Sequence, residues 1–498
     1  IRRPPTSTPK PSSAASDVYK RQDIGSKRAK AVIIDDEKVL EKVSVNIEDL
    51  FERPKPAWAQ RDPLLVWERV KAMLKEMKNI ASVRSICIDA TSGTIIPIDR
   101  TGMPIHKALM YNDSRAIKEA DDLKIHSPKA REFEEFLPIA PYLVIPKILW
   151  LRNHVEAFKN VFKILHENDF YTFLLTGEIA TSSNIAGKSH ADIYEERYIE
   201  EIYKDMKIPV DIMPPIKPVG AIIGYVTSSA SEETGIPEGV PVINGVTDSS
   251  AGDVSTGVCK VGQVSVAIGT TLVIHAIVDK VIPDPRKRIY YKTYFGKKYI
   301  VGGATNAGSL ALDAISKLLK IPIEVLDQMA EEIPPGCDGL IAQPQWTGTR
   351  LPRSNPDMRG YFLGLTEKNC TPGHLFRSLL EGNAAVLDIM LRIVEEVTGV
   401  EVKEIRISGG CAKSDVQNQI IADITGKVVR RMKTAEPALG SAIIAAWGIN
   451  KTKEIHEIAS KVVKIDKEYS PKNKYREIYE QVKDKLELSM KLLDTYFS

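Results

Sequence analysis

Two short turns of the same design constrain the architecture that this chain can adopt. The stretch "AIGTT" (267–271) ends an alternating apolar run, and "DIGSK" (23–27) likewise places a glycine and a hydroxyl at a strand end. Glycine lets the backbone approach a ligand, and nearby N–H and O–H donors suit an anion such as phosphate. An ordinary β-turn explains either stretch taken singly. Their matching places in two halves of the chain predict a phosphate site formed by two related lobes.

Strand and helix patterns interleave through the rest of the chain, which predicts an α/β fold. "KAVIIDD" and "KVLEKVSV" predict a hairpin, and "DPLLVWERVKAMLKEM" predicts a helix with Asp62 as its N-cap. Ser414, followed three residues later by Gln417, predicts a capping box on a helix over 414–424. Paired glycine turns are typical of the actin/hexokinase-type architecture, in which two ribonuclease H-like domains surround a central cleft.

The length of 498 residues allows two or three domains. We expect an N-terminal sugar-side domain over residues 23–243, a nucleotide-side domain over 244–450 and a C-terminal helical extension over 451–498.

Residues 1–22 differ in composition from everything that follows them. They are basic, rich in proline and serine and aperiodic, which predicts a disordered tail. "SSAASDVYKRQ" also resembles translated adaptor sequence, so the tail is alternatively an artefact. We expect at most a short strand near 18–24, and a first phosphate loop that is less well anchored than the second.

The composition narrows the class of partner. A net charge of +3 is too small to indicate nucleic acid or an anionic membrane as a partner. The longest small-apolar run, 439–449, is too short to span a bilayer. Five separated cysteines without a metal-type cluster argue against disulfides and structural zinc, and predict a cytoplasmic protein.

The stretch "NGVTDSSAGD" (244–253) carries the candidate catalytic residue. Asp248 follows a strand, so its carboxylate is expected at a cleft, where it could take the proton of a hydroxyl during phosphoryl transfer. An Asx-turn that caps the next segment is the alternative. Asp23 supplies a carboxylate suited to Mg²⁺. Gly409 and Gly410 would let a flat ligand or a phosphate approach, although a tight strand–helix connection also explains them.

An ordered series of stretches resembles the FGGY carbohydrate kinases from Asp23 to the C-terminus. Besides the two turns and "GVTD", the series consists of "PAWAQRDPLLVW" (56–67), "YNDSRA" (111–116), "IPKILWL" (145–151), "LLTGEIATSSN" (174–184), "GLIAQPQWTGTRLPRSNPDMRGYFLGL" (339–365), "RSLLEGNAA", "SGGCAKSDVQNQIIADITG" and "EPALGSAIIAAWG". No single stretch is decisive, but their order is highly specific.

The resemblance implies an ATP- and Mg²⁺-dependent sugar kinase with Asp248 as general base. It assigns to the nucleotide, its phosphates and the metal a set of residues that comprises Asp23, Gly25, Ser26, Gly269, Thr270, Thr271, Gly308, Gly409, Gly410 and Asn418. Sugar and ATP would be its ligands, and a homodimer is one possible assembly.

The expected substrate is a small ketose or polyol, and the ketopentoses ribulose and xylulose are the first candidates. "DATSGTIIPID" (89–99), with Thr91 and Ser92, lacks the Gln-Met-His-Gly stretch of xylulokinases and is closer to ribulokinases. Lys188 resembles a sugar-contacting lysine of ribulokinases, and a solvated loop lysine is an equal alternative. Asp113 either positions the substrate or pairs with Arg115.

Other functions stay open at this point. A kinase for another polyol, such as glycerol or erythritol, is one alternative. A non-catalytic nucleotide-dependent switch or chaperone of the same architecture is another, and an inactive fragment is a third.

Overall fold

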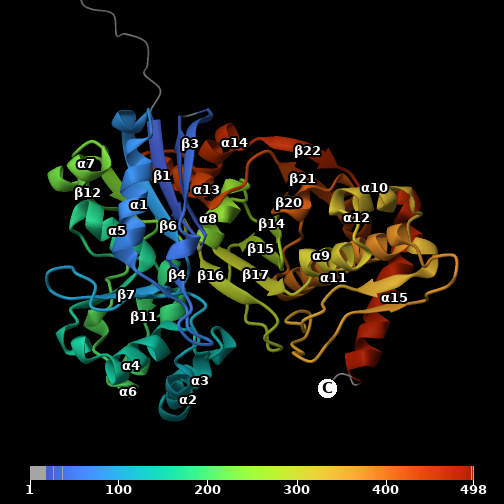
Figure 1. Cartoon of the computed structure of the whole chain (residues 1–498), viewed down its shortest axis with the longest axis horizontal. Coiled ribbons are helices and arrows are strands. Elements are labelled where there is room, and N and C mark those ends of the chain that lie inside the picture. Colours follow the sequence, from blue (N-terminus) through green and yellow to red (C-terminus); the bar gives the residue numbers. More distant parts are fainter. Residues whose placement is uncertain (1–17, 26, 36, 495, 497–498) are drawn as a thin grey trace, which may run out of the picture.

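Two large β-sheets with their helices form the body of the protein (Figure 1). The computed structural model describes residues 18–25, 27–35, 37–494 and 496. In this part of the chain no helix is long and apolar enough to cross a membrane.

The first sheet has six strands built from the N-terminal half of the chain. In order across the sheet they are β12 (Ile222–Tyr225), β13 (Pro241–Ile243), β6 (Val83–Ala90), β1 (Val18–Ile24), β2 (Arg28–Ile34) and β3 (Val39–Asn46). Strand β1 pairs antiparallel with β2 and parallel with β6, and β13 is parallel to β6. The predicted hairpin is therefore confirmed as β2 and β3.

The second sheet has seven strands from the C-terminal half. In order they are β16 (Tyr290–Thr293), β17 (Tyr299–Thr305), β15 (Leu272–Val278), β14 (Gln263–Ile268), β20 (Glu404–Ser408), β21 (Val428–Met432) and β22 (Ile465–Tyr469). Strands β14, β15 and β17 are antiparallel neighbours, whereas β14, β20 and β21 run parallel. Each sheet thus joins three antiparallel strands to two parallel strands and an antiparallel edge strand, and the second sheet adds β16 as a further antiparallel strand beside β17. This repetition confirms the prediction of two related α/β domains.

Strand β2 shows why the first sheet needs cover on both faces. Ala31 and Ile33 lie in the apolar cluster with helix α1 (Pro63–Lys75), while Val32 and Ile34 lie in the cluster with helix α13 (Pro437–Ile449). Alternate residues of a strand point to opposite faces, so a continuous apolar run is buried on both sides.

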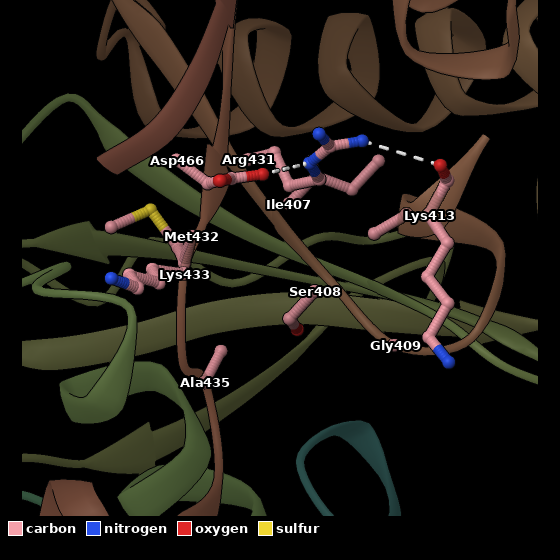
Figure 2. Close-up of a pocket in the computed structure, with 10 residues that line it drawn as sticks. Ile407, Ser408, Gly409, Lys413, Arg431, Met432, Lys433, Ala435 and Asp466 are labelled. Carbon is pink, nitrogen blue, oxygen red and sulfur yellow. Dashed lines mark hydrogen bonds and ion pairs between the residues drawn. The ribbon is translucent and has the colours of Figure 1, made fainter. Parts of the chain in front are cut away.

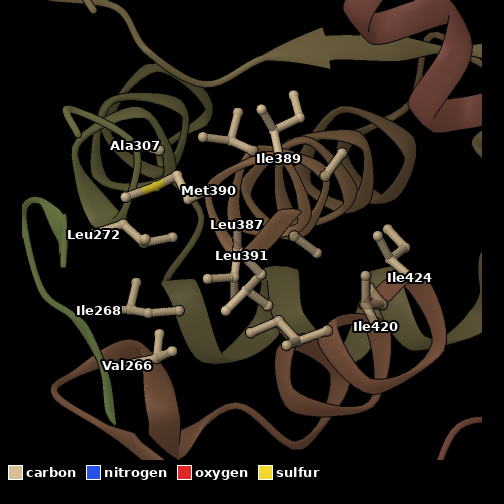
Figure 3. Close-up of a cluster of buried hydrophobic side chains, with 14 of the residues drawn as sticks. Val266, Ile268, Leu272, Ala307, Leu387, Ile389, Met390, Leu391, Ile420 and Ile424 are labelled. Atoms are coloured by element: carbon tan, nitrogen blue, oxygen red, sulfur yellow. The ribbon is translucent and has the colours of Figure 1, made fainter. Parts of the chain in front are cut away.

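Helix α11 (Pro372–Thr398) organises the core of the second half. Figure 3 shows Leu387 and Leu391 of α11 among Val266 and Ile268 of the sheet and Ile420 of helix α12 (Asp415–Thr425). Leu387 is completely buried, which fits a helix whose apolar side packs between a sheet and a second helix.

Smaller elements extend the two halves. The remaining strands are β4 (Phe51–Glu52), β5 (Gln60–Arg61), β8 (Ala108–Leu109), β7 (Ile95–Ile98) and β9 (Lys163–His166) in one five-stranded sheet, with two-stranded pairs β10 (Ala191–Asp192)/β11 (Arg197–Tyr198) and β18 (Ile341–Gln343)/β19 (Tyr361–Leu363). The remaining helices are α2 (Ile117–His126), α3 (Pro128–Glu132), α4 (Val144–His154), α5 (Glu167–Thr176), α6 (Glu200–Asp205), α7 (Ser228–Thr234), α8 (Asp248–Ser255), α9 (Ser309–Leu319), α10 (Ile323–Glu332), α14 (Ile455–Val462) and α15 (Arg476–Asp494).

Three sequence-based expectations need correction. The tail assigned to residues 1–22 ends too late, because residues 18–22 belong to strand β1 and pair on both sides; the short strand expected near 18–24 is confirmed, and residues 1–17 lie outside the described residues. The extension over 451–498 is not only helical, because β22 forms an edge of the second sheet. The predicted capping box is half formed: Ser414 Oγ accepts from the Gln417 N–H, but the Gln417 side chain donates to the Leu380 carbonyl instead. Asp62 does cap α1, as predicted.

Helix α13 crosses from the second half to cover one face of the first sheet, where it packs on α8 (Figure 1). The two helices approach so closely that a Cβ added at Gly440 would lie 1.6 Å from the Ala251 carbonyl oxygen. Glycine at 440 is therefore required by the contact between α13 and α8.

We expect Gly440→Ala to destabilise the protein, although glycine-to-alanine changes inside helices usually stabilise by about 0.5–1 kcal/mol. Overpacking typically costs about 1–3 kcal/mol and should dominate here. Gly252→Ala, on α8 itself, is the matched control because an added Cβ there meets nothing within 4 Å. Urea-unfolding midpoints measure both, and an unchanged or higher midpoint for Gly440→Ala would contradict the close contact.

Candidate active site

The predicted site segments of the N-terminal half follow the carboxyl ends of parallel strands in the first sheet. Gly25 follows β1, Thr91 follows β6 and Asp248 begins α8 shortly after β13. Because β1, β6 and β13 are parallel, these segments meet at one edge of the sheet.

A buried ion pair joins the first glycine turn to the Thr91 segment. The Arg61 guanidinium pairs with the Glu167 carboxylate, and both side chains are fully buried. Arg61 Nη1 also donates to the Gly25 carbonyl at 2.8 Å, and Thr91 Oγ1 donates to Glu167 Oε2 at 3.0 Å. The first turn is thus fixed by a side chain as well as by the Gly25 N–H bond to Arg28 O. Because the second turn is also held by backbone hydrogen bonds, the expectation that the first loop is less well anchored than the second stays a prediction.

Lys188 spans the segment that follows β6. Its Nζ donates to the Ser92 carbonyl at 3.0 Å, and its chain lies against Gly93, where an added Cβ would be 2.6 Å from Lys188 Cδ. Burial lowers the pKa of Lys188 to about 8, and the positive charge of Lys292 acts in the same direction while Asp248 opposes it. Lys188 is therefore a half-buried ammonium beside Asp248 rather than a solvated loop lysine.

Asp248 is the first residue of helix α8. Its Oδ1 accepts from the Ser249 N–H at 2.7 Å, and the residue is half-buried. Burial raises the pKa of Asp248, whereas the ammonium groups of Lys292 and Lys188 lower it and Glu167 raises it further. The carboxylate is thus held near two cations at the end of β13, where a base for a bound hydroxyl would need to lie.

Asp113 is satisfied within its own loop. Both of its oxygens accept from Arg115, and Oδ2 also accepts from the Ala59 N–H at 2.6 Å. Asp113 is fully buried, and the Arg115 guanidinium lies 3.8 Å from the Trp58 ring centroid. Of the two alternatives for Asp113, pairing with Arg115 is what the structure displays.

Lys147 on α4 links two loops of the sugar side. It is completely buried, and its Nζ donates to the carbonyls of Gly93 at 2.9 Å and Met110 at 2.6 Å. Burial lowers the pKa of Lys147 well below its usual value. A lysine inside the apolar run "IPKILWL" was a signal for such a linking role.

The second glycine turn contacts two other predicted glycines. Gly269 O accepts from the Ser309 N–H at 2.8 Å, and a Cβ at Gly308 would lie 2.5 Å from that same oxygen. Gly409, at φ +94°, packs equally closely on the Ile268 carbonyl. These glycines therefore form one surface with the exposed Thr270 and the half-buried Thr271, whereas a Cβ at Gly269 itself meets nothing within 4 Å.

A pocket of about 420 Å³ opens beside the glycine pair (Figure 2). Its lining comes from the end of β20 with the following turn, from β21 and from β22. Ser408, Gly409 and Lys413 lie on one side, and Lys433 lies across the pocket. Concave sites beside strand ends with a few polar groups are typical of small-ligand binding.

Asn418 lies behind this pocket rather than in its wall. It is completely buried, and its Nδ2 donates to the Ala412 carbonyl at 2.8 Å. Asn418 thus holds the turn after Gly410 in place. The side chains of Asp23 and Ser26 lie outside the described residues; the backbone of β1 makes Asp23 the register partner of Asp89.

Sequence reasoning missed several residues that build this site. Arg61, Lys147 and Asn184 lie in stretches that resemble the family, but no role was predicted for them, and only the charge within an apolar run marked Lys147. Glu167 and Lys292 lie in none of these stretches. Among the described residues, no group of three or more histidine, cysteine, aspartate or glutamate side chains could hold a metal ion.

Models of the FGGY family of carbohydrate kinases match most of the chain. The N-terminal domain model matches residues 18–255 and the C-terminal domain model matches residues 269–449. The chain belongs to the FGGY family of carbohydrate kinases, enzymes that transfer a phosphoryl group from ATP to a sugar.

Relatives and solved structures agree with this assignment. A xylulose kinase of Staphylococcus epidermidis is 26% identical over 480 residues, which cover 92% of this chain and 93% of that protein. A gluconokinase of Bacillus subtilis is 24% identical, covering 79% and 80% respectively. The crystal structure of xylulose kinase from Rhodospirillum rubrum has a TM-score of 0.87 at 24% identity, covering 96% of this chain and 99% of that one. The predicted two-domain actin/hexokinase-type fold is confirmed.

We expect Gly269→Val to weaken ATP binding while sugar binding is retained. An added Cβ would meet no protein atom within 4 Å, so the fold should persist, but the branched side chain would occupy the space into which a phosphate must come. Isothermal titration with ATP and with sugar separates the two affinities. Weakened sugar binding with unchanged ATP binding would show that the turn faces the other ligand.

Proposed function

We propose that this carbohydrate kinase phosphorylates a ketopentose, with xylulose first and ribulose second, and uses ATP with Mg²⁺. The observation that carries the proposal is the half-buried Asp248 carboxylate, placed beside Lys188 at the strand edge that also bears the first glycine turn. Several relatives are xylulose kinases, which supports xylulose. The absence of a Gln-Met-His-Gly stretch over 89–99 keeps ribulose as the second candidate.

In the proposed reaction, Asp248 accepts the proton of a sugar hydroxyl as its oxygen attacks the γ-phosphorus of ATP. The bond from that phosphorus to the ADP oxygen breaks, and the sugar phosphate and ADP leave. Lys188 and the Thr91–Ser92 segment hold the sugar, whereas Gly25 with Ser26, and Gly269 with Thr270 and Thr271, hold the phosphates from two sides. Gly308, Gly409 and Gly410 bound the nucleotide, and Asn418 supports their turn.

Asp23 would hold the Mg²⁺ ion that accompanies ATP. Mg²⁺ at phosphates is typically bound through one or two carboxylates, and the backbone of β1 brings Asp23 to the end of the strand that precedes the glycine turn. The ion would neutralise phosphate charge. The cytoplasm is the compartment we propose, since none of the five cysteines, all of which lie in the described part of the chain, forms a disulfide; a homodimer remains a prediction that light scattering can test.

A coupled assay of ADP release tests the substrate. Xylulose and ribulose should stimulate ADP release more than glycerol, erythritol or gluconate at equal concentration. If glycerol, erythritol or gluconate is turned over fastest, that compound replaces the ketopentose as the proposed substrate. If the protein binds ATP but releases no ADP in the presence of any of these sugars, the non-catalytic switch is favoured.

We expect Asp248→Asn to lower kcat by roughly 10²–10⁴ while ATP affinity is kept, because the amide cannot take the hydroxyl proton. The substitution preserves shape and the oxygen that can accept from the Ser249 N–H. Stopped-flow kcat and titration with ATP measure the two quantities. Near-normal turnover would remove Asp248 from the base role.

A further inference from the structure

Lys292 is a cation that the second sheet delivers to Asp248. It lies on the edge strand β16, whereas Asp248 begins α8 directly after the first sheet. The charged groups around Asp248 are Lys292 from β16, Lys188 from the loop before β10 and Glu167 from α5. Around Lys292 they are Asp253, Asp248 and Lys188. Lys292 thus acts electrostatically on the Asp248 carboxylate, although the two residues are far apart in the sequence.

A buried chain of hydrogen bonds fixes β16 against α8. Tyr290 on β16 bonds through its hydroxyl to His275 Nε2 at 2.7 Å, and His275 Nδ1 bonds to Asp253 Oδ2 of α8 at 2.7 Å. His275 and Asp253 are almost completely buried. Residues 290 and 292 point to the same face of the strand, and Lys292 Nζ lies 5.3 Å from the Tyr290 ring centroid. Lys292 therefore extends on the side of β16 that is bonded to α8.

Asn184 ties the same two elements together from the sugar side. Its Nδ2 donates to the Thr293 carbonyl at 2.5 Å and to Ser250 Oγ at 3.1 Å. Its Oδ1 accepts from the Thr247 N–H at 3.0 Å. Asn184 is nearly fully buried and begins the turn that carries Lys188. One amide thus sets the places of the residues directly before Asp248 and directly after Lys292.

We propose that Lys292 is a positioning residue for phosphoryl transfer: its ammonium stabilises the carboxylate form of Asp248 that receives the sugar proton. The inference rests on the proposed role of Asp248 as base but not on which sugar is bound. Burial by itself disfavours the ionised form of Asp248, and Glu167 adds negative charge nearby. Without Lys292, the ammonium of Lys188 would have to offset both effects. Lys292 supplies the second positive charge, and the hydrogen bonds that hold β16 against α8 keep it on the side that faces α8.

The pH dependence of kcat/KM tests this role. A base must be ionised, so activity is present above its pKa and is lost as pH falls through it. Removing a neighbouring cation raises that pKa. We therefore expect the acidic limb of Lys292→Met to move to higher pH by about one unit or more. Lys292→Arg keeps the charge and should restore the limb to its original position.

Lys297→Met is the matched control, since Lys297 is exposed on the same β16–β17 hairpin and undergoes the same chemical change. Its limb should coincide with that of the unaltered protein. If Lys292→Met lowers the thermal midpoint, Lys292→Gln takes its place with a side chain that remains polar. The proposal would be overturned if the acidic limb of the kcat/KM profile does not move in the neutral variants, or if Lys292→Arg moves it as far as Lys292→Met does.

The outcome for Asp248→Asn separates this inference from the function on which it rests. If Asp248→Asn is inactive and the neutral Lys292 variants keep their acidic limb, the role of Lys292 is wrong and the base stands. If Asp248→Asn is active, the base assignment is wrong and the role of Lys292 falls with it. The profile is measured with whichever sugar the assay accepts, so a failed choice of sugar leaves the test valid.

Discussion

The contact between helices α13 and α8 supports the arrangement on which the site depends. Helix α13 comes from the second half of the chain, yet it covers a face of the first sheet together with α8. The near-contact of Gly440 with the Ala251 carbonyl leaves no room for a side chain. Because α8 begins at Asp248, the same contact holds the candidate base in place. The two halves are therefore joined at the helix that begins with the proposed base.

In the site, the free-energy cost of burying charged side chains is offset by ion pairs and hydrogen bonds. Arg61 and Glu167 are both fully buried, and each would be costly without the other. Their pairing also fixes Gly25 and Thr91, so one ion pair sets a predicted phosphate loop and a predicted sugar segment. Lys147 is kept in the interior by two backbone carbonyls and ties further loops together. These buried charges give the loops defined positions on a rigid sheet edge.

Similarity over the whole chain decides the family, but it does not decide the substrate. The family follows from matches that span residues 18–255 and 269–449, and it fixes the transfer of a phosphoryl group to a sugar. Relatives of similar identity include a xylulose kinase and a gluconokinase, so overall similarity does not select the sugar. We therefore expect the choice of sugar to depend on side chains of the proposed site, such as Lys188 and those of the segment after β6.

Local sequence determined the parts of this protein whose physics is local. The glycine turns at 25 and 269, the helix that begins after Asp62 and the alternating strands could be predicted, because turn geometry, capping and apolar periodicity act over a few residues. The order of several such stretches indicated the family and, with it, Asp248.

By contrast, only the tertiary structure decided what lies around that residue. Lys292 and Asn184 are far from Asp248 in sequence; strand pairing and buried hydrogen bonds place Asn184 on the neighbouring Thr247 and Ser250 and bring Lys292 within electrostatic reach of the carboxylate. Strand β1 is a similar case: residues 18–22 have a poor strand pattern, but partners on both sides supply the hydrogen bonds that complete the sheet. Long-range pairing of this kind leaves no mark in the composition of a segment, so it had to be found in the fold.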